Sequence, residues 1–327
     1  MIKKINKKKL SIICTYLSLF CICFIFFLFP NEEPEAQDVK SNSWMSNIKD
    51  EEFLYNINIP GTHDSGTRYT AGLVTGVVAS CQDKSITQQL DSGIRYLDIR
   101  LDIDMDVNHA GVVCYTSVWT FKKNKLTITK VLDKVKKFLD KNSSETVIIQ
   151  IKPEGTLDRE NKDYLTELNK ILEKYSSNMY SNTSNNKSMR ELTMGDVRGK
   201  FIIVSRDKHP TGAYRYVGWP DNCTLGSSML DGVETFLQDK YESKTKSDKM
   251  ACIKDFYNNV WKDENINKKF VINFVSCMGP YCPEIVAKQI NPEFKEYIND
   301  NKNQKFGIVL TDVPEDDLIS SIYNTNF

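Results

Sequence analysis

The chain lacks a net charge and is poor in histidine. Its 327 residues carry 43 Lys and Arg against 43 Asp and Glu, with only three histidines. Nonspecific nucleic-acid binding uses an overall basic field, so we expect no nucleic-acid partner. A glycine-rich phosphate loop of either common type is also missing after the first predicted strand, which disfavours a dinucleotide-binding fold. The apolar fraction of 40% is ordinary for a globular protein.

Charged residues are also missing from one long apolar run, residues 10–29. Five lysines precede this run, and a positive flank before an apolar segment is typical of an export signal. The run has about the 20 residues that span a bilayer, and its positive flank should stay in the cytoplasm. A buried core helix fits badly, because such a helix would rarely be uncharged around its whole circumference.

Two fates remain open for residues 1–36, a cleaved signal peptide and a retained signal-anchor helix with a short linker. Ala36 offers only a poor cleavage site. In either case we expect the rest of the chain outside the cell, secreted or tethered to the outer face of the membrane by residues 10–29. The polar, acidic stretch 31–43 is typical of a linker, so the folded domain is predicted at 44–327.

Metal-binding cysteine patterns are absent as well. Six cysteines lie in the body of the chain, but their spacings match no zinc site, and no histidine lies near Cys277 and Cys282. An even number permits disulfides in an oxidising compartment. We expect Cys277 to pair with Cys282 and Cys81 with Cys114, with plain buried thiols as the alternative.

Short apolar runs alternate with amphipathic stretches along the body of the chain. Apolar residues recur at helical spacing over 131–139 and 164–172. Such alternation predicts an α/β fold with a parallel sheet and crossover helices. Eight strands in a domain of this size favour a single (β/α)8 TIM barrel over an open sheet. The candidate strands are 54–59, 94–101, 106–113, 146–151, 200–205, 235–238, 270–276 and 306–311.

Polar residues fall where such a barrel would place its active site. Barrel enzymes build their sites at the C-terminal ends of the strands, and seven polar residues lie at or just beyond such an end: His63, Arg100, His109, Lys152, Arg206, Asp239 and Asp312. Asp98 and Arg100 are two residues apart on one strand and therefore share a face. Two imidazoles, a carboxylate and a guanidinium around one phosphate are the groups that general acid and base cleavage of a phosphodiester requires.

Seven short motifs make the chain similar to a known family. In order they are IPGTHDS at 59–65, ITQQL at 86–90, GIRYLDIR at 93–100, WPDN at 219–222, QDKY at 238–241, INPE at 290–293 and LTD at 310–312. From about Trp44 to the C-terminus, the chain thus resembles the bacterial-type phosphatidylinositol-specific phospholipases C, the X-domain family. Each motif is weak alone, but chance would have to place each at the end of a different strand. The resemblance implies a distorted, incompletely closed barrel.

The same resemblance implies a reaction. The inositol 2-hydroxyl attacks the phosphodiester between inositol and diacylglycerol, which gives a cyclic inositol phosphate. His63 would deprotonate that hydroxyl, and Asp312 would orient His63 and stabilise its imidazolium. His109 would protonate the departing oxygen, assisted by Asp64 or Asp98. Histidine suits both roles, because an unperturbed pKa of about 6.5 lets one ring be neutral and the other protonated near neutral pH.

The resemblance also assigns the remaining site residues. Arg100 would clamp the phosphoryl oxygens as charge develops on them. Calcium-dependent relatives need an acidic residue at this position, so we expect no metal and no cofactor. Lys152, Arg206 and Asp239 would hold the inositol hydroxyls, and Tyr241 would pack against the inositol ring.

One position departs from the family pattern close to the chemistry. Family members commonly carry His-Gly where this chain has His109 and Ala110. The added methyl group would shift the loop if the backbone there needs a positive φ, so we expect a less precisely placed loop and retained activity.

The apolar segment 71–79 is either a core helix or a rim that dips into the membrane interface. The third histidine, His209, is expected to be structural.

Two other functions remain open. A metal-dependent glycerophosphodiester phosphodiesterase on a similar barrel needs an acidic metal cluster near the first histidine, where Arg100 stands instead. A catalytically silent lipid-binding surface protein of the same fold needs no matched acid and base. The favoured partner is phosphatidylinositol or a glycosylated inositol (GPI) anchor at the membrane surface, bound by a monomer.

Overall fold

The computed structural model describes residues 39–70, 79–117, 124–154, 162–185, 187–206, 210–243, 245–278 and 282–327. The chain divides into two compact units, Met1–Val39 and Lys40–Phe327, and the second contains all of the helices and strands given below. The expected export segment, most of the segment 71–79 and His209 lie outside the described residues. Among the helices that are described, none has the length and hydropathy of a membrane span.

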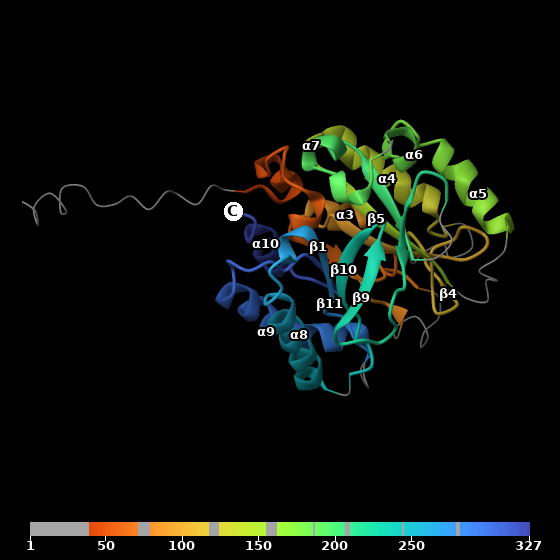
Figure 1. Ribbon diagram of the computed structural model, residues 1–327. Helices are drawn as coiled ribbons and strands as arrows, with labels where there is room; N and C mark the ends of the chain where they lie inside the picture. Colours follow the sequence, from red (N-terminus) through yellow and green to blue (C-terminus); the bar gives the residue numbers. More distant parts are fainter. Residues whose placement is uncertain are drawn as a thin grey trace, which may run out of the picture. The chain divides into compact units, whose positions relative to one another are not determined.

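Nine strands of the described residues form a closed ring surrounded by helices (Figure 1). The order around the ring is β5, β2, β1, β12, β11, β10, β9, β8 and β7, and β7 pairs back with β5. A short strand, β6 (Met179–Tyr180), pairs with β7 as well. The ring strands are β1 Ile59–Thr62, β2 Tyr96–Leu101, β5 Val147–Pro153, β7 Phe201–Ser205, β8 Tyr214–Val217, β9 Gly226–Leu230, β10 Val233–Gln238, β11 Phe270–Phe274 and β12 Ile308–Thr311.

The predicted α/β barrel is confirmed, but its construction differs from eight parallel strands. β9 runs antiparallel to both β8 and β10, whereas the other pairings of the ring are parallel. Asp231 and Gly232 join β9 to β10 with φ of 45° and 81°, as a two-residue hairpin turn requires. The chain therefore reverses directly, without a crossover helix. The extra strand completes the ring, so the expected incomplete closure is not found among the described strands.

Two candidate strands are not barrel strands in the way the sequence predicted. Residues 54–56 form a 3-10 turn, η2 (Leu54–Asn56), and the first ring strand begins only at Ile59. Residues 108–113 form a separate hairpin of β3 (Asn108–His109) and β4 (Val112–Val113). The other six candidates correspond to β2, β5, β7, β10, β11 and β12. The strands β8 and β9 were not predicted.

Amphipathic helices cover the outside of the ring (Figure 1). The predicted apolar face of α4 is confirmed, because its six apolar residues between Ile128 and Leu139 are all buried. The helices α8, α9 and α10 pack against the ring through one apolar cluster that includes Phe256, Phe294 and Phe306. The described α-helices are α3 Ile86–Asp91, α4 Ile128–Lys141, α5 Lys162–Glu173, α6 Asn182–Asn185, α7 Met194–Val197, α8 Lys246–Val260, α9 Pro283–Asp300 and α10 Asp316–Asn324. Besides η2, the described 3-10 helices are η1 Ser41–Asn47, η3 Met189–Glu191 and η4 Ile266–Lys268.

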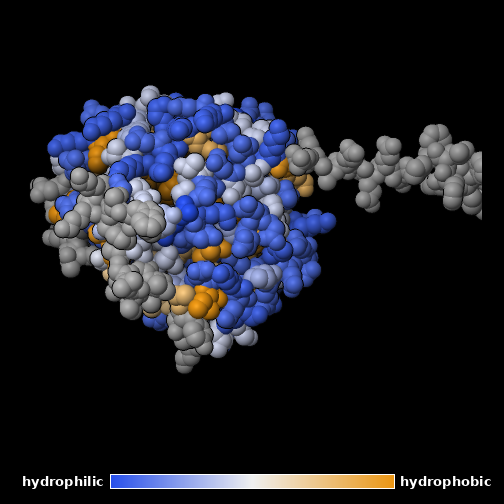
Figure 2. All heavy atoms as spheres, turned by 180° about the vertical axis from the view of Figure 1, so that it is seen from behind, coloured by the Kyte–Doolittle hydropathy of each residue, from blue (hydrophilic) through white to orange (hydrophobic). Residues whose placement is uncertain are grey.

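The surface seen from behind is mainly hydrophilic, with small and separate apolar spots (Figure 2). Scattered apolar side chains of this kind are normal on a protein surface.

The two predicted disulfides are not formed. All six cysteines of the body, including Cys277 and Cys282, are free thiols. The sulfur atoms of Cys81 and Cys114 lie near backbone carbonyl oxygens of their own segments, at 3.8 Å and 4.0 Å. Both thiols are buried, so these residues are the plain buried thiols that were the alternative.

Candidate active site

Two adjacent parallel strands bring His63 and Asp312 together. β1 and β12 pair with Thr62 opposite Thr311, so the next residue of each strand emerges at the same end of the barrel. His63 Nδ1 lies 2.9 Å from Asp312 Oδ1. The Gln82 side-chain amide donates to the backbone carbonyls of His63 and Thr311 and ties the two strand ends together. The contact that orients His63 is thus built into the strand register.

Arg100 lies at the centre of the cluster. It stands on β2, the strand beside β1, and its Nε lies 2.8 Å from Asp64 Oδ1. Its Nη2 lies 2.9 Å from His63 Nε2 and 3.4 Å from Asp98 Oδ2, and its Nη1 lies 3.8 Å from Glu154 Oε2. Burial lowers the pKa of Arg100, but the three carboxylates outweigh burial and raise it above its ordinary value. The guanidinium is therefore a fixed positive charge.

His109 reaches the cluster from outside the ring. It stands on the β3–β4 hairpin, which is attached to the end of β2 by an isolated β-bridge. Its Nδ1 lies 2.7 Å from Asp64 Oδ2. The centre of its ring lies 6.2 Å from that of His63, at an interplanar angle of 85°. The two predicted catalytic histidines therefore face one cluster.

Ala110, the departure from the family pattern, has a positive φ of 50° at the turn of this hairpin. The backbone at residue 110 therefore has the positive φ at which the added methyl group was expected to shift the loop. A left-handed conformation costs a residue with a Cβ about 1–2 kcal/mol. The hairpin nevertheless keeps His109 on Asp64, and the Ala110 backbone N–H donates to Glu154 Oε1 at 3.3 Å.

Asp64 is the carboxylate that the cationic groups share. One of its oxygens contacts Arg100, and the other lies 3.0 Å from His63 Nε2 and 2.7 Å from His109 Nδ1. Its side chain is only 1% exposed. Burial alone would raise the pKa of Asp64, but Arg100 and the two histidines hold it well below its usual range. Asp64 is therefore a permanent anion between the two rings.

The two nitrogens of His63 allow either protonation state. Nδ1 donates to Asp312 in both states. In the neutral ring Nε2 accepts from Arg100, and in the imidazolium it donates to Asp64. Burial lowers the pKa of His63, but Asp64 and Asp312 outweigh burial and raise it to about 9. The ring can therefore take up a proton at Nε2 without losing a partner.

Of the two carboxylates expected to assist His109, the structure brings Asp64 to it. Asp98 is fully buried beside Arg100 instead, and its other oxygen accepts from Gln150 Nε2 at 2.8 Å. Burial raises the pKa of Asp98, but Arg100, His63 and Arg206 together outweigh burial and lower it. Asp98 thus orients Arg100, and the expected contact of Asp98 with His109 is not observed.

Two of the predicted substrate-binding residues, Arg206 and Asp239, contact Trp219. The Arg206 guanidinium carbon lies 4.0 Å from the centre of the indole ring, and Arg206 Nη2 lies 3.7 Å from Asp239 Oδ2. Trp219 Nε1 donates to the same Asp239 oxygen at 3.1 Å. Tyr241 donates its hydroxyl to Asp221 at 2.9 Å, which raises the pKa of Tyr241 to about 12. Trp219 belongs to the WPDN motif at 219–222, but no role was predicted for it from the sequence.

Glu154 is a residue that the sequence prediction missed. It lies 3.4 Å from Lys152 Nζ and 3.8 Å from Arg100, besides accepting from the Ala110 backbone. Glu154 therefore joins the end of β5 to β2 and to the His109 hairpin. Its position three residues after the candidate strand 146–151 was the signal that could have identified it.

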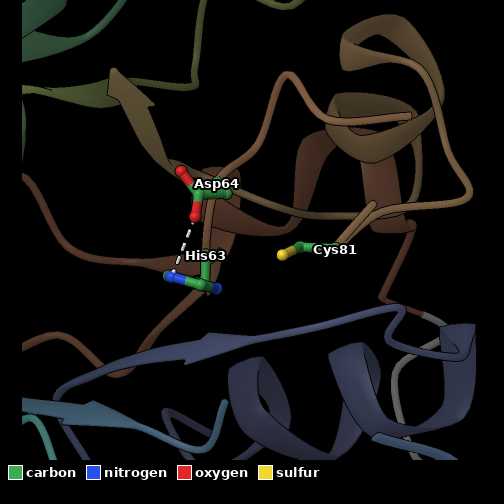
Figure 3. A group of neighbouring side chains, drawn as sticks. All are labelled: His63, Asp64 and Cys81. Carbon is green, nitrogen blue, oxygen red and sulfur yellow. Dashed lines mark ion pairs between the residues drawn. The ribbon is translucent and has the colours of Figure 1, made fainter. Parts of the chain in front are cut away.

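The Cys81 side chain lies beside His63 and Asp64 and was also not predicted as a site residue (Figure 3). Its sulfur, a ring nitrogen of His63 and a carboxylate oxygen of Asp64 all lie within 4.8 Å of one another. Burial, Asp312 and Asp64 raise the pKa of this thiol well above its ordinary value. Cys81 is therefore a protonated thiol behind the general-base position.

A hard cation fits poorly between the carboxylates of the cluster. Asp64, Asp98 and Glu154 are the acidic groups that contact Arg100, which lies within 4.0 Å of each. A calcium or magnesium ion among these oxygens would meet the guanidinium. A second acidic group, formed by Asp102 and its neighbours 104 and 106, lies in the loop that follows β2.

Comparisons with known proteins agree with this geometry. Residues 57–207 match the family model described as phosphatidylinositol-specific phospholipase C, X domain. The chain is similar to 1-phosphatidylinositol phosphodiesterase of Listeria monocytogenes, with 25% identity over 331 residues that cover 95% of this chain and 96% of that protein. It is 28% identical to the protein of the same name from Staphylococcus aureus strain Newman over 319 residues, 89% of this chain and 97% of that one.

Solved structures show the same fold. The structure of the phosphatidylinositol-specific phospholipase C of Listeria monocytogenes has a TM-score of 0.70 and 24% identity, and the match covers 88% of this chain and 100% of that one. The resemblance predicted from the sequence motifs is confirmed. This chain is related to the bacterial phosphatidylinositol-specific phospholipases C through most of its length.

Proposed function

We propose that this relative of the bacterial phosphatidylinositol-specific phospholipases C is itself such an enzyme, a lyase that cleaves the phosphodiester of phosphatidylinositol. The observation that carries the proposal is the sharing of Asp64 by His63 and His109, both within 3.0 Å of one carboxylate oxygen. Matched acid and base groups around a fixed guanidinium serve catalysis, and a lipid-binding module does not need them. The named relatives act on the same bond, as 1-phosphatidylinositol phosphodiesterases.

His63 is the general base of the reaction. The inositol 2-hydroxyl oxygen bonds to phosphorus, and its proton passes to His63 Nε2, while Asp312 holds Nδ1 at 2.9 Å. The attack is intramolecular, so the nucleophile is already in place when the lipid binds. The resulting ring makes inositol 1,2-cyclic phosphate the first soluble product.

His109 is the general acid. As the bond between phosphorus and the diacylglycerol oxygen breaks, His109 gives that oxygen a proton and releases diacylglycerol. Its Nδ1 is engaged by Asp64 at 2.7 Å, so Nε2 is the nitrogen that delivers the proton. The Asp64 carboxylate, a permanent anion, holds the His109 ring in place. A positioned acid or base of this kind contributes about 10²- to 10⁴-fold to the rate.

Arg100 stabilises the charge that develops on the phosphoryl oxygens and needs no metal to do so. Its fork of donors is held by Asp64, Asp98 and Glu154 and cannot swing away. Lys152, Arg206 and Asp239 bind inositol hydroxyls at the rim of this cluster, and Tyr241 packs against the inositol ring. The reaction is therefore metal-independent.

The enzyme works at a membrane surface outside the cell. The lysine-flanked apolar run 10–29 supports export, with the folded unit either secreted or tethered to the outer face of the membrane. Its substrate is phosphatidylinositol or the glycosylated form of this lipid that anchors surface proteins. A monomer suffices, because one chain supplies both histidines and Arg100.

One assay tests the reaction class. The full chain is incubated with phosphatidylinositol labelled in the inositol ring, in excess chelator. Release of cyclic inositol phosphate supports the proposal. Activity that returns only with added metal would point to a glycerophosphodiester phosphodiesterase, and no release under either condition would point to a silent lipid-binding protein.

Histidine variants test the assigned roles. His63→Ala and His109→Ala should each lower kcat by about 10²- to 10⁴-fold, because each removes one proton transfer. Circular dichroism should show that both variants are folded, although His63→Ala should melt below the parent because it loses the ion pairs with Asp64 and Asp312. Parent-level turnover in either variant contradicts the assignment. His209→Ala is the matched control and should turn over like the parent.

A further inference from the structure

We propose that a soft divalent cation such as Zn²⁺ binds at His63, Asp64 and Cys81 and reversibly blocks the active site. The binding itself needs only these three residues, and the inhibition rests on the proposed function of His63 as the general base. The three side chains come from two segments of the chain, the end of β1 and the segment before α3, and they lie close to one another (Figure 3).

The three ligand atoms already lie close to the geometry of a metal site. All are within 4.8 Å of one another, so a central point is at most 4.8/√3, or about 2.8 Å, from each. Zinc bonds are about 2.3 Å to sulfur and about 2.0–2.2 Å to nitrogen or oxygen. Side-chain movements of roughly 0.5–0.8 Å close this difference. One nitrogen, one oxygen and one sulfur with a water in the fourth position form an ordinary zinc ligand set.

Charge conservation explains why such an ion is tolerated beside Arg100. Zn²⁺ replaces two protons, one from the His63 imidazolium and one from the Cys81 thiol, and both protons leave to solvent. The cluster therefore carries the same net charge before and after binding. No oxidation or reduction takes place. Asp64 supplies one oxygen of the site and Asp312 lies 2.9 Å from the same imidazole, so two carboxylates supply the negative field that attracts the cation.

The thiolate decides which ions bind. Sulfur ligands select Zn²⁺ and other soft ions, whereas Ca²⁺ and Mg²⁺ prefer sites made of oxygen. Entry is possible because the His63 side chain is 18% exposed at the mouth, although Cys81 itself is only 1% exposed. A bound ion occupies a nitrogen lone pair of His63 and displaces the side chain that now contacts this nitrogen. His63 can then no longer accept the proton of the inositol hydroxyl.

The test uses binding and activity together. Cd²⁺ is titrated into the chelator-treated full chain, and the thiolate-to-cadmium absorption band in the ultraviolet is recorded. In parallel, Zn²⁺ inhibition of phosphatidylinositol cleavage is measured, with Mg²⁺ and Ca²⁺ as comparison ions. We expect the band and a saturable loss of activity with the soft ions only, reversed by chelator.

Cys81→Ser is the informative variant, and Cys114→Ser is its matched control. Both thiols are buried on the mouth side of the barrel, but only Cys81 joins the group with His63 and Asp64. Losing one ligand should weaken Zn²⁺ inhibition by at least roughly 10- to 100-fold and abolish the cadmium band, while Cys114→Ser should behave like the parent. Cys81→Ala serves the same purpose should the serine variant be poorly folded in a melting experiment.

Each outcome has a separate meaning. Equal inhibition of the parent and both Cys81 variants, or a parent chain without the cadmium band, overturns the proposed site. A band that depends on Cys81 in a chain that releases no cyclic inositol phosphate supports the site and refutes the proposed function. A band without inhibition refutes the claim that the bound ion blocks His63.

Discussion

Two arginines stand at opposite ends of the same strand, the fully buried Arg95 just before β2 and the partly buried Arg100 near its end. Arg95 is fully buried, and its donors go to Glu145 at 2.8–2.9 Å and to the backbone carbonyls of Leu90, Ile94 and Ser41. Arg100 is 11% exposed, and its partners are carboxylates and both histidines. One end of the strand holds a completed ion pair, and the other holds a cluster of titratable groups that faces solvent.

The surroundings move the pKa of the two guanidinium groups in opposite directions. Burial lowers the pKa of Arg95, and the single carboxylate of Glu145 does not fully offset this. At Arg100 three carboxylates outweigh burial and raise the pKa. Both groups stay charged at neutral pH, since arginine starts from a pKa above 12. The difference teaches that both groups are charged because they are arginines, whereas the number of nearby carboxylates decides whether the pKa is lowered or raised.

Breaking the buried ion pair between Arg95 and Glu145 should have the largest effect on stability. Arg95→Met leaves Glu145 buried without a cation and should lower the free energy of unfolding by about 3–5 kcal/mol. Urea denaturation measures this loss, and activity per folded molecule should remain. The double variant Arg95→Met with Glu145→Leu removes both charges and should recover much of the loss. A parent-like midpoint for the single variant would contradict the structural role of Arg95.

The corresponding change at Arg100, near the C-terminal end of β2, should affect the reaction and leave the fold intact. Arg100→Lys keeps the charge but loses the fork of donors, so kcat should fall by about 10²- to 10³-fold. Steady-state kinetics on phosphatidylinositol vesicles measure this fall, and the urea midpoint is the control. If Arg100→Lys instead lowers the midpoint as much as Arg95→Met and spares kcat, the contrast between the two ends fails.

A variant of Asp312, which contacts His63 in the same cluster as Arg100, should have a smaller effect. Asp312→Asn removes one carboxylate that raises the pKa of His63, so this pKa should fall from about 9 toward the ordinary 6.5. NMR titration of the ring protons measures the pKa, and the chain has only three histidines to assign. The ascending limb of the pH profile of kcat/KM should move to lower pH in parallel.

The same shift has a consequence for stability. The pKa of His63 is higher in the folded chain than in the unfolded chain, so its ion pairs stabilise the fold fully below about pH 6.5. This contribution is lost as pH rises through about 9. Asp312→Asn should reduce this pH dependence, because Asp64 remains beside His63, and an unchanged pKa of His63 in the variant would show that Asp64 alone raises it.

Much of the barrel could be predicted because helical and strand periodicity are local. The buried face of α4 and six of the ring strands follow from patterns within about ten residues. The hairpin of β9 and β10 was missed although Asp231 and Gly232 are a typical two-residue turn, since the prediction looked for crossover helices after each strand. The segment 106–113 was misplaced because a hairpin has the same alternation as a barrel strand.

The sequence by itself determined which groups stand at the strand ends, including His63, Arg100 and Asp312, because a strand delivers its last residues to one end of a barrel. Only the tertiary structure decided that Asp64 lies between two histidines, that Glu154 joins three segments, and that Cys81 lies behind His63. These contacts depend on the register between neighbouring strands and on a hairpin outside the ring. Neither can be read from local spacing, because hydrogen bonds between distant segments set both.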